Sequence, residues 1–124
     1  MQDNCRIELN GKDTFIDEAN FKLLLRLAVQ IKNDKNEGWV NMPDIITDEI
    51  SFKTVNDYHN YIYRLRKDLK HSLINQNPSD FIENNPLGNY RISTHPGNIT
   101  YNKENLMKNF SNDQYILELA KQLP

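Results

Sequence analysis

The strongest constraint in this chain is an apolar stripe along residues 51–72. Its members recur at steps of three and four residues: Val55, Tyr58, Ile62, Leu65 and Leu69. At about 100° per residue, these positions share one face of a helix. The pattern therefore predicts a long helix with one face buried, and the rest of the chain must supply the core that covers it.

The opposite face of this predicted helix is basic and rich in amides. Residues 52–72 contain five Lys or Arg against two Asp, although the whole chain has a net charge of -2. Basic side chains attract phosphates, and Asn and Arg can hydrogen-bond base edges in a major groove. Any surface helix also carries charges on its outer face, so the pattern alone leaves a nucleic-acid role and a plain solvated face both open. The residues that project from this side are Lys53, Asn56, Asp57, Asn60, Arg64, Lys67 and His71.

The N-terminal third predicts a hairpin followed by a helix. Asn10-Gly11 lies between two short apolar-polar alternations, and both residues tolerate positive φ, so residues 6–16 should form a β-hairpin. A helix should then begin at Asp17 or Glu18 and end near Asn33. Its apolar residues cover a broad face, so we expect it to be the central helix of the core.

Shorter elements follow on both sides of the long helix. Trp39 should anchor the core, with a stacking platform for bases as the alternative, and a brief second helix is expected at residues 43–47. Residues 73–80 have the composition of a loop, and residues 81–92 predict a second hairpin with its tip at residues 84–89. The positions expected to be buried are Phe21, Leu24, Leu25, Trp39, Val55, Tyr58, Ile62, Leu65, Leu69 and Tyr90.

Two motifs carry a resemblance to a known family. They are YRLRKDL at residues 63–69 and IENNPLGNYRI at residues 82–92. They resemble the recognition helix and the wing of the OmpR/PhoB-type winged-helix effector domain of bacterial response regulators, over about residues 5–93. The resemblance implies an α+β fold, a winged helix-turn-helix with an N-terminal β-hairpin, a three-helix core and a C-terminal wing hairpin, here followed by extra C-terminal helices.

The resemblance also implies a DNA-binding transcription regulator, with the helix of residues 51–72 in the major groove and the wing on the adjacent backbone or minor groove. In the wing, however, Pro86 replaces the family's arginine, and Leu87 and Asn89 replace glycines. These departures and the sequence pI near 5.9 leave open an alternative, a winged-helix protein-protein interaction module without specific DNA binding. The residues expected to contact double-stranded DNA are Lys53, Asn56, Asn60, Tyr63, Arg64, Lys67, His71, Asn85, Asn89 and Arg91.

The end of the chain extends beyond the family-like region. We expect residues 1–98 to form the winged-helix domain and residues 99–124 to form a helical extension packed on the same domain. A capping pattern from Ser111 to Gln114 predicts a final helix. Its stripe either packs on its own domain or serves a homodimer or another partner: Ile116, Leu119, Ala120 and Leu123.

Patterns typical of catalysis or metal binding are missing from the sequence. The three histidines and Cys5 lack the short spacing of a metal site, and the isolated glycines form no phosphate loop. No two carboxylates stand out as an acid and base couple. We therefore expect no enzyme, cofactor or metal. The single cysteine, with neither a signal peptide nor an apolar run of membrane-spanning length, predicts a cytoplasmic protein without membrane contact.

Overall fold

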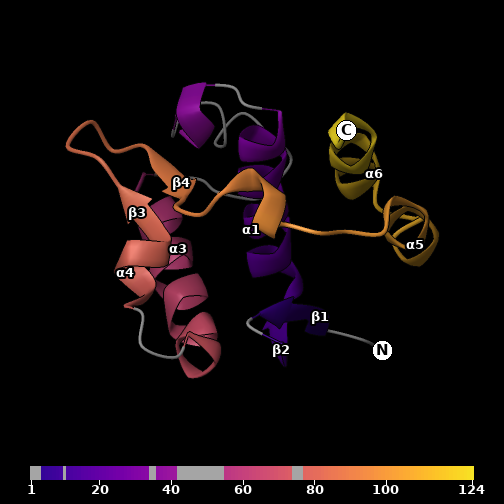
Figure 1. Ribbon diagram of the computed structural model, residues 1–124, viewed down its shortest axis with the longest axis horizontal. Coiled ribbons are helices and arrows are strands. Elements are labelled where there is room, and N and C mark those ends of the chain that lie inside the picture. The colour runs from indigo at the N-terminus through magenta and orange to yellow at the C-terminus, as the bar shows by residue number, and fades with distance from the viewer. Residues whose placement is uncertain (1–3, 10, 34–35, 42–54, 74–76) are drawn as a thin grey trace.

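The computed structural model describes residues 4–9, 11–33, 36–41, 55–73 and 77–124. These residues form an α+β fold with five α-helices and two small antiparallel hairpins, so the expected fold class is confirmed at this level. The helix α1 (Glu18–Lys32) stands at the centre (Figure 1). On one side lie α3 (Val55–Leu69) and the second hairpin, and on the other lie α5 (Lys103–Asn109) and α6 (Gln114–Gln122).

The N-terminal hairpin pairs β1 (Asn4–Leu9) with β2 (Lys12–Asp17) and is slightly longer than the sequence pattern predicted. Leu9 pairs with Lys12, which leaves a two-residue turn in which Gly11 has a φ of 76°. A left-handed residue at this position suits the twist of a tight hairpin. The strand β2 alternates as expected for a half-buried strand, with Thr14 and Ile16 buried.

The central position predicted for α1 is confirmed. The helix begins where expected, because the Asp17 side chain accepts a hydrogen bond from the backbone N–H of Asn20 at 2.8 Å. Leu23 and Leu27 are fully buried. Leu24 is only half-buried, contrary to prediction, because it lines a groove that α1 shares with β1 and α5.

The long helix α3 is confirmed from Val55 onward and continues into a 3-10 turn at Lys70–Ser72. Ile62, Leu65 and Leu69 are almost fully buried, as the stripe predicted. Three further predictions lie outside the described residues: the start of the helix at residues 51–54, the short helix at residues 43–47, and the burial of the Val55 and Tyr58 side chains.

Polar contacts fix the rotation of α3 against the N-terminal elements. The Asn20 side chain is fully buried and donates to Asp68 Oδ2 at 3.0 Å. One turn further on, the buried hydroxyls of Thr14 and Ser72 share a hydrogen bond. Buried polar groups of this kind are costly to separate, so they define which residues of α3 face outward.

The second hairpin is preceded by a helix that the sequence analysis missed. Residues 78–80 were expected to be loop, but α4 (Pro78–Phe81) begins there, with the Asn77 side chain accepting from the backbone N–H of Ser79 at 3.0 Å. An asparagine cap followed by proline at the first helical position is a recognised helix start, so residues 77 and 78 of the sequence already indicated this helix.

The hairpin itself is confirmed, with β3 (Ile82–Asn84) antiparallel to β4 (Tyr90–Ile92). Val40 adds a bridge on the other edge, with backbone N–O distances of 2.8 and 3.2 Å to Tyr90. The neighbouring Trp39 is only half-buried, which corrects its expected place in the core. Its ring instead lies 4.4 Å from the Arg91 guanidinium.

The C-terminal helices pack on the rest of the chain. Residues Ile116, Leu119, Ala120 and Leu123 are all buried, and three of them belong to the same core cluster as α1. The stripe is thus covered within the chain, so these four side chains are not exposed for the homodimer that was the alternative. The cap was also placed wrongly: Asp113, rather than Ser111, accepts from the backbone N–H of Ile116 at 3.1 Å. A carboxylate at this position also interacts favourably with the positive end of the helix.

The Asp113 cap should give the protein a weak acid sensitivity. Burial alone raises the pKa of this carboxyl, but the Ile116 N–H and Lys22, 3.0 Å away, outweigh burial and hold the pKa below its ordinary value. A depressed folded-state pKa stabilises the fold above the unfolded pKa and loses this effect as the pH falls. Asp113→Ala should therefore cost about 1 kcal/mol at pH 7. In urea titrations, the difference from wild type should shrink below about pH 4; a difference independent of pH would contradict this.

Candidate nucleic-acid interface

Four of the residues predicted to contact DNA share the outward face of α3. Asn60, Tyr63, Arg64 and Lys67 are all exposed, Tyr63 by 67% of its surface. Their spacing places them on one side of the helix, opposite Ile62, Leu65 and Leu69. Lys70, which was not among the predicted residues, is also exposed at the end of the helix. Together, the five exposed residues form the basic face of α3: Asn60, Tyr63, Arg64, Lys67 and Lys70.

Few carboxylates accompany the cations in the second half of α3. The only acidic residue among positions 60–70 is Asp68, which is half-buried and accepts the hydrogen bond from Asn20. Arg64, Lys67 and Lys70 are exposed, and Asp68, one helical turn after Arg64, is engaged by the buried Asn20. The Arg64 guanidinium lies over the Tyr61 ring at 5.4 Å, a cation-π contact that leaves it on the surface.

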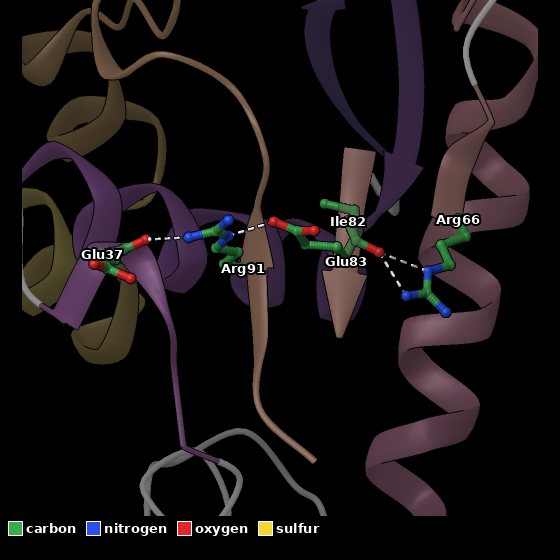
Figure 2. Close-up of polar contacts among 5 residues, drawn as sticks. All are labelled: Glu37, Arg66, Ile82, Glu83 and Arg91. Atoms are coloured by element: carbon green, nitrogen blue, oxygen red, sulfur yellow. Dashed lines mark hydrogen bonds and ion pairs between the residues drawn. The ribbon is translucent and has the colours of Figure 1, made fainter. Parts of the chain in front are cut away.

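Arg66 has a structural role in the same helix. Its Nε and Nη2 donate to the carbonyl oxygen of Ile82 at 2.9 and 2.5 Å, and Nη2 also reaches Asn84 Oδ1 at 3.2 Å. Figure 2 shows this arginine extending from α3 to the first strand of the hairpin. Burial lowers the pKa of the guanidinium, which still stays protonated at neutral pH. Arg66 and Lys67 are consecutive, so the hairpin that Arg66 binds flanks the basic face.

Arg66 is bonded to the hairpin whereas Arg64 is exposed, so the two arginines should contribute differently to the stability of the fold. Lysine keeps the charge but loses the fork that lets Arg66 bind two acceptors, so Arg66→Lys should lower the free energy of unfolding by about 1 to 2 kcal/mol. Arg64→Lys is the matched control and should change it by less than about 0.5 kcal/mol. Equal losses in chemical denaturation would show that Arg66 does not hold the hairpin.

Arg91, one of the residues predicted to contact DNA, makes several contacts within the protein. Its Nε forms an ion pair with Glu83 on the facing strand, and its Nη1 donates to the carbonyl oxygen of Glu37 at 3.1 Å (Figure 2). Its guanidinium also covers the Trp39 ring. These contacts engage Arg91 within the protein, because the antiparallel register places it directly opposite Glu83. The arginine therefore ties the hairpin to the segment before Val40.

The two predicted asparagines of the hairpin build its turn. Asn85 Oδ1 accepts from the backbone N–H groups of Leu87 and Asn89, each at 3.0 Å. Both asparagines are half-buried, while Leu87 between them is 85% exposed. The prominent side chain of the tip is therefore an apolar residue that the sequence analysis noted only as a departure from the family.

The remaining predicted contacts are not placed by the structure. Lys53 lies outside the described residues, and the Asn56 and His71 side chains are likewise not described. Within the described parts of the chain, no group of three or more His, Cys, Asp or Glu side chains is arranged to hold a metal ion. In the same parts, no helix combines the length and apolar character needed to cross a membrane.

Comparisons with protein families, curated proteins and solved structures give no match for this chain. Its function is therefore inferred from the geometry of the basic face and of the hairpin beside it.

Proposed function

We propose that this protein binds double-stranded DNA as a winged-helix transcription regulator, with α3 as its recognition helix and the hairpin β3–β4 as its wing. The order of the elements supports this proposal, because a hairpin, a central helix, a long helix and a second hairpin follow one another. The motif of residues 63–69 that resembles the recognition helix of OmpR/PhoB-type domains lies within α3.

The basic face of α3 is the observation that carries the proposal. An α-helix fits the major groove of B-form DNA, and its outward residues then meet phosphates and base edges. Lys67 and Lys70 can neutralise phosphates, Arg64 can donate two hydrogen bonds to guanine, and Asn60 can bond adenine. The opposite side of the helix is held in the core, so the face is presented on a rigid support.

DNA binding by the three cations of the basic face is compatible with the negative net charge of the whole protein. Phosphate neutralisation depends on the local excess of positive charge, whereas the net charge of -2 lowers attraction at other surfaces. We therefore expect moderate nonspecific affinity, with discrimination that depends on α3.

A fluorescence titration against duplexes of random sequence tests this proposal directly. Labelled DNA and RNA duplexes of equal length should be compared at low salt. A recognition helix in the major groove should favour B-form DNA, because the major groove of A-form RNA is too deep and narrow to be read by side chains. If the protein binds neither duplex, or binds both equally, the proposal that α3 contacts the DNA major groove would be rejected.

The alternative is a protein-protein interaction module that keeps the winged-helix arrangement. The hairpin supports this alternative, because its single arginine, Arg91, is paired with Glu83 and leaves no free cation among residues 82–92. If neither duplex binds at low salt while the protein remains folded, this interpretation replaces the first.

A further inference from the structure

The tip of the hairpin is a rigid turn. Besides the two bonds that Asn85 Oδ1 accepts, the backbone N–H of Gly88 donates to the Asn85 carbonyl at 3.0 Å, and the N–H of Asn85 donates to the Asn89 carbonyl at 3.1 Å. Gly88 has a φ of 81°, which glycine adopts without strain, and the ring of Pro86 fixes the backbone in the first half of the turn. The turn is thus ordered before any partner arrives.

This turn presents one large apolar side chain. Leu87 is 85% exposed, more than the other two exposed large apolar residues of the described chain, Tyr63 and Phe15. The loop that carries it extends well away from the helices (Figure 1). Exposure of this kind costs free energy in water, since burying a leucine is worth about 1.5 to 3 kcal/mol. A polar residue would fill the same turn position without that cost.

The wing has little to offer a phosphate. Between residues 82 and 92 the only charged side chains are Glu83 and Arg91, which pair with each other. Asn84 and Asn85 each use the side-chain oxygen for a contact within the protein, so the polar groups that they can offer a phosphate are uncharged amide N–H donors. The wing therefore has no unpaired cation to attract a phosphate, and its most exposed side chain is the apolar Leu87.

We propose that Leu87 acts as an apolar wedge that enters the minor groove and partly unstacks one base step. This inference rests on the proposed function, because it takes DNA on the basic face of α3 as given. Minor-groove proteins use single apolar side chains in this way and bend the duplex toward the major groove. Arg66 holds β3 against α3 and so fixes the tip relative to the recognition helix.

The surroundings of Leu87 favour DNA over a protein partner. Its neighbours at the tip are Asn85, Pro86, Gly88 and Asn89, so the exposed apolar surface of the tip is limited to Leu87 and the small ring of Pro86. Protein docking sites usually need several apolar side chains together, whereas a wedge needs only one. The lone leucine on a rigid turn therefore matches a base step better than a protein groove.

Bending and unstacking should be measured with the full chain and two probes. One is a duplex of random sequence labelled at both ends for energy transfer, and the other carries 2-aminopurine beside a central TA step, which unstacks easily. Wild type should raise energy transfer and 2-aminopurine emission, and it should prefer a duplex with a central T·T mismatch, where unstacking costs less.

Leu87→Ala should abolish the bend and the mismatch preference and lower affinity about tenfold, with the salt dependence unchanged. Leu87→Met should preserve the bend, the mismatch preference and the affinity. Phe15→Ala is the matched control, since it removes an exposed apolar side chain from β2 instead. Salt-dependent binding without bending, or bending that survives Leu87→Ala, would overturn the wedge and leave the basic face intact. Absence of any DNA binding by wild type would reject both the wedge and the proposed function.

Discussion

Leu119→Glu should unfold most of the protein. Leu119 is 4% exposed in the core that α6 shares with α1, so the substitution removes a buried side chain and places a carboxylate among apolar neighbours. Losing the leucine alone costs about 2 to 5 kcal/mol. An unpaired buried charge adds several kcal/mol more, which together approach the 5 to 15 kcal/mol that typically stabilises a domain.

The adjacent residue provides the control for this substitution. Glu118 is exposed, and its ion pair with Lys121 joins two side chains that are each more than half exposed. Glu118→Ala should therefore change the free energy of unfolding by no more than about 0.5 kcal/mol. Circular dichroism should show a loss of helical signal for Leu119→Glu but not for Glu118→Ala. A folded Leu119→Glu variant whose mass in solution halves would instead show that α6 serves a dimer.

The double substitution Arg64→Ala with Lys67→Ala should lower DNA affinity by about 30-fold or more at low salt, because each contact is worth about 1 to 3 kcal/mol. Both side chains are exposed, so the variant should keep the melting temperature of wild type within a few degrees. Unchanged affinity in this folded variant would exclude α3 as the recognition helix.

A charge-matched control separates this effect from a change in net charge. Lys108 on α5 and Lys121 on α6 are exposed and belong to helices on the far side of α1 from α3 (Figure 1). Lys108→Ala with Lys121→Ala removes the same charge as the first pair. Its DNA affinity should stay within about threefold of wild type, since its cations lie away from the proposed interface.

Periodicity predicted the larger elements of this fold well. The stripe of α3 and the broad apolar face of α1 correspond to buried side chains such as Leu65 and Leu27, because burial of one helix face dominates the choice of its residues. The first hairpin follows from turn chemistry at Gly11, whereas the second was predicted from its two flanking segments and the family resemblance. The four-residue helix α4 escaped notice because it has no apolar period, although its cap and proline were readable.

The roles of individual arginines were harder to predict. Helical spacing correctly placed Arg64 outward, since that depends only on position along α3. The pairing of Arg91 depends on the strand register and on the carbonyl of Glu37, more than fifty residues away in the chain. Contacts of that kind arise from tertiary packing, which a local pattern does not specify. Leu87 was visible in the sequence, but its exposure on a rigid turn was not.

The salt dependence of DNA binding tests the central claim most directly. Titrations of a random-sequence duplex between about 50 and 200 mM salt give the slope of log affinity against log salt, which is close to -0.9 for each phosphate neutralised. If Lys67 and Lys70 each contact a phosphate while Arg64 contacts a base, wild type should have a slope near -2 and the Arg64 and Lys67 double variant a slope near -1. The lysine control should retain the wild-type slope. A wild-type slope near zero, or one that the double variant leaves unchanged, would contradict DNA binding through α3.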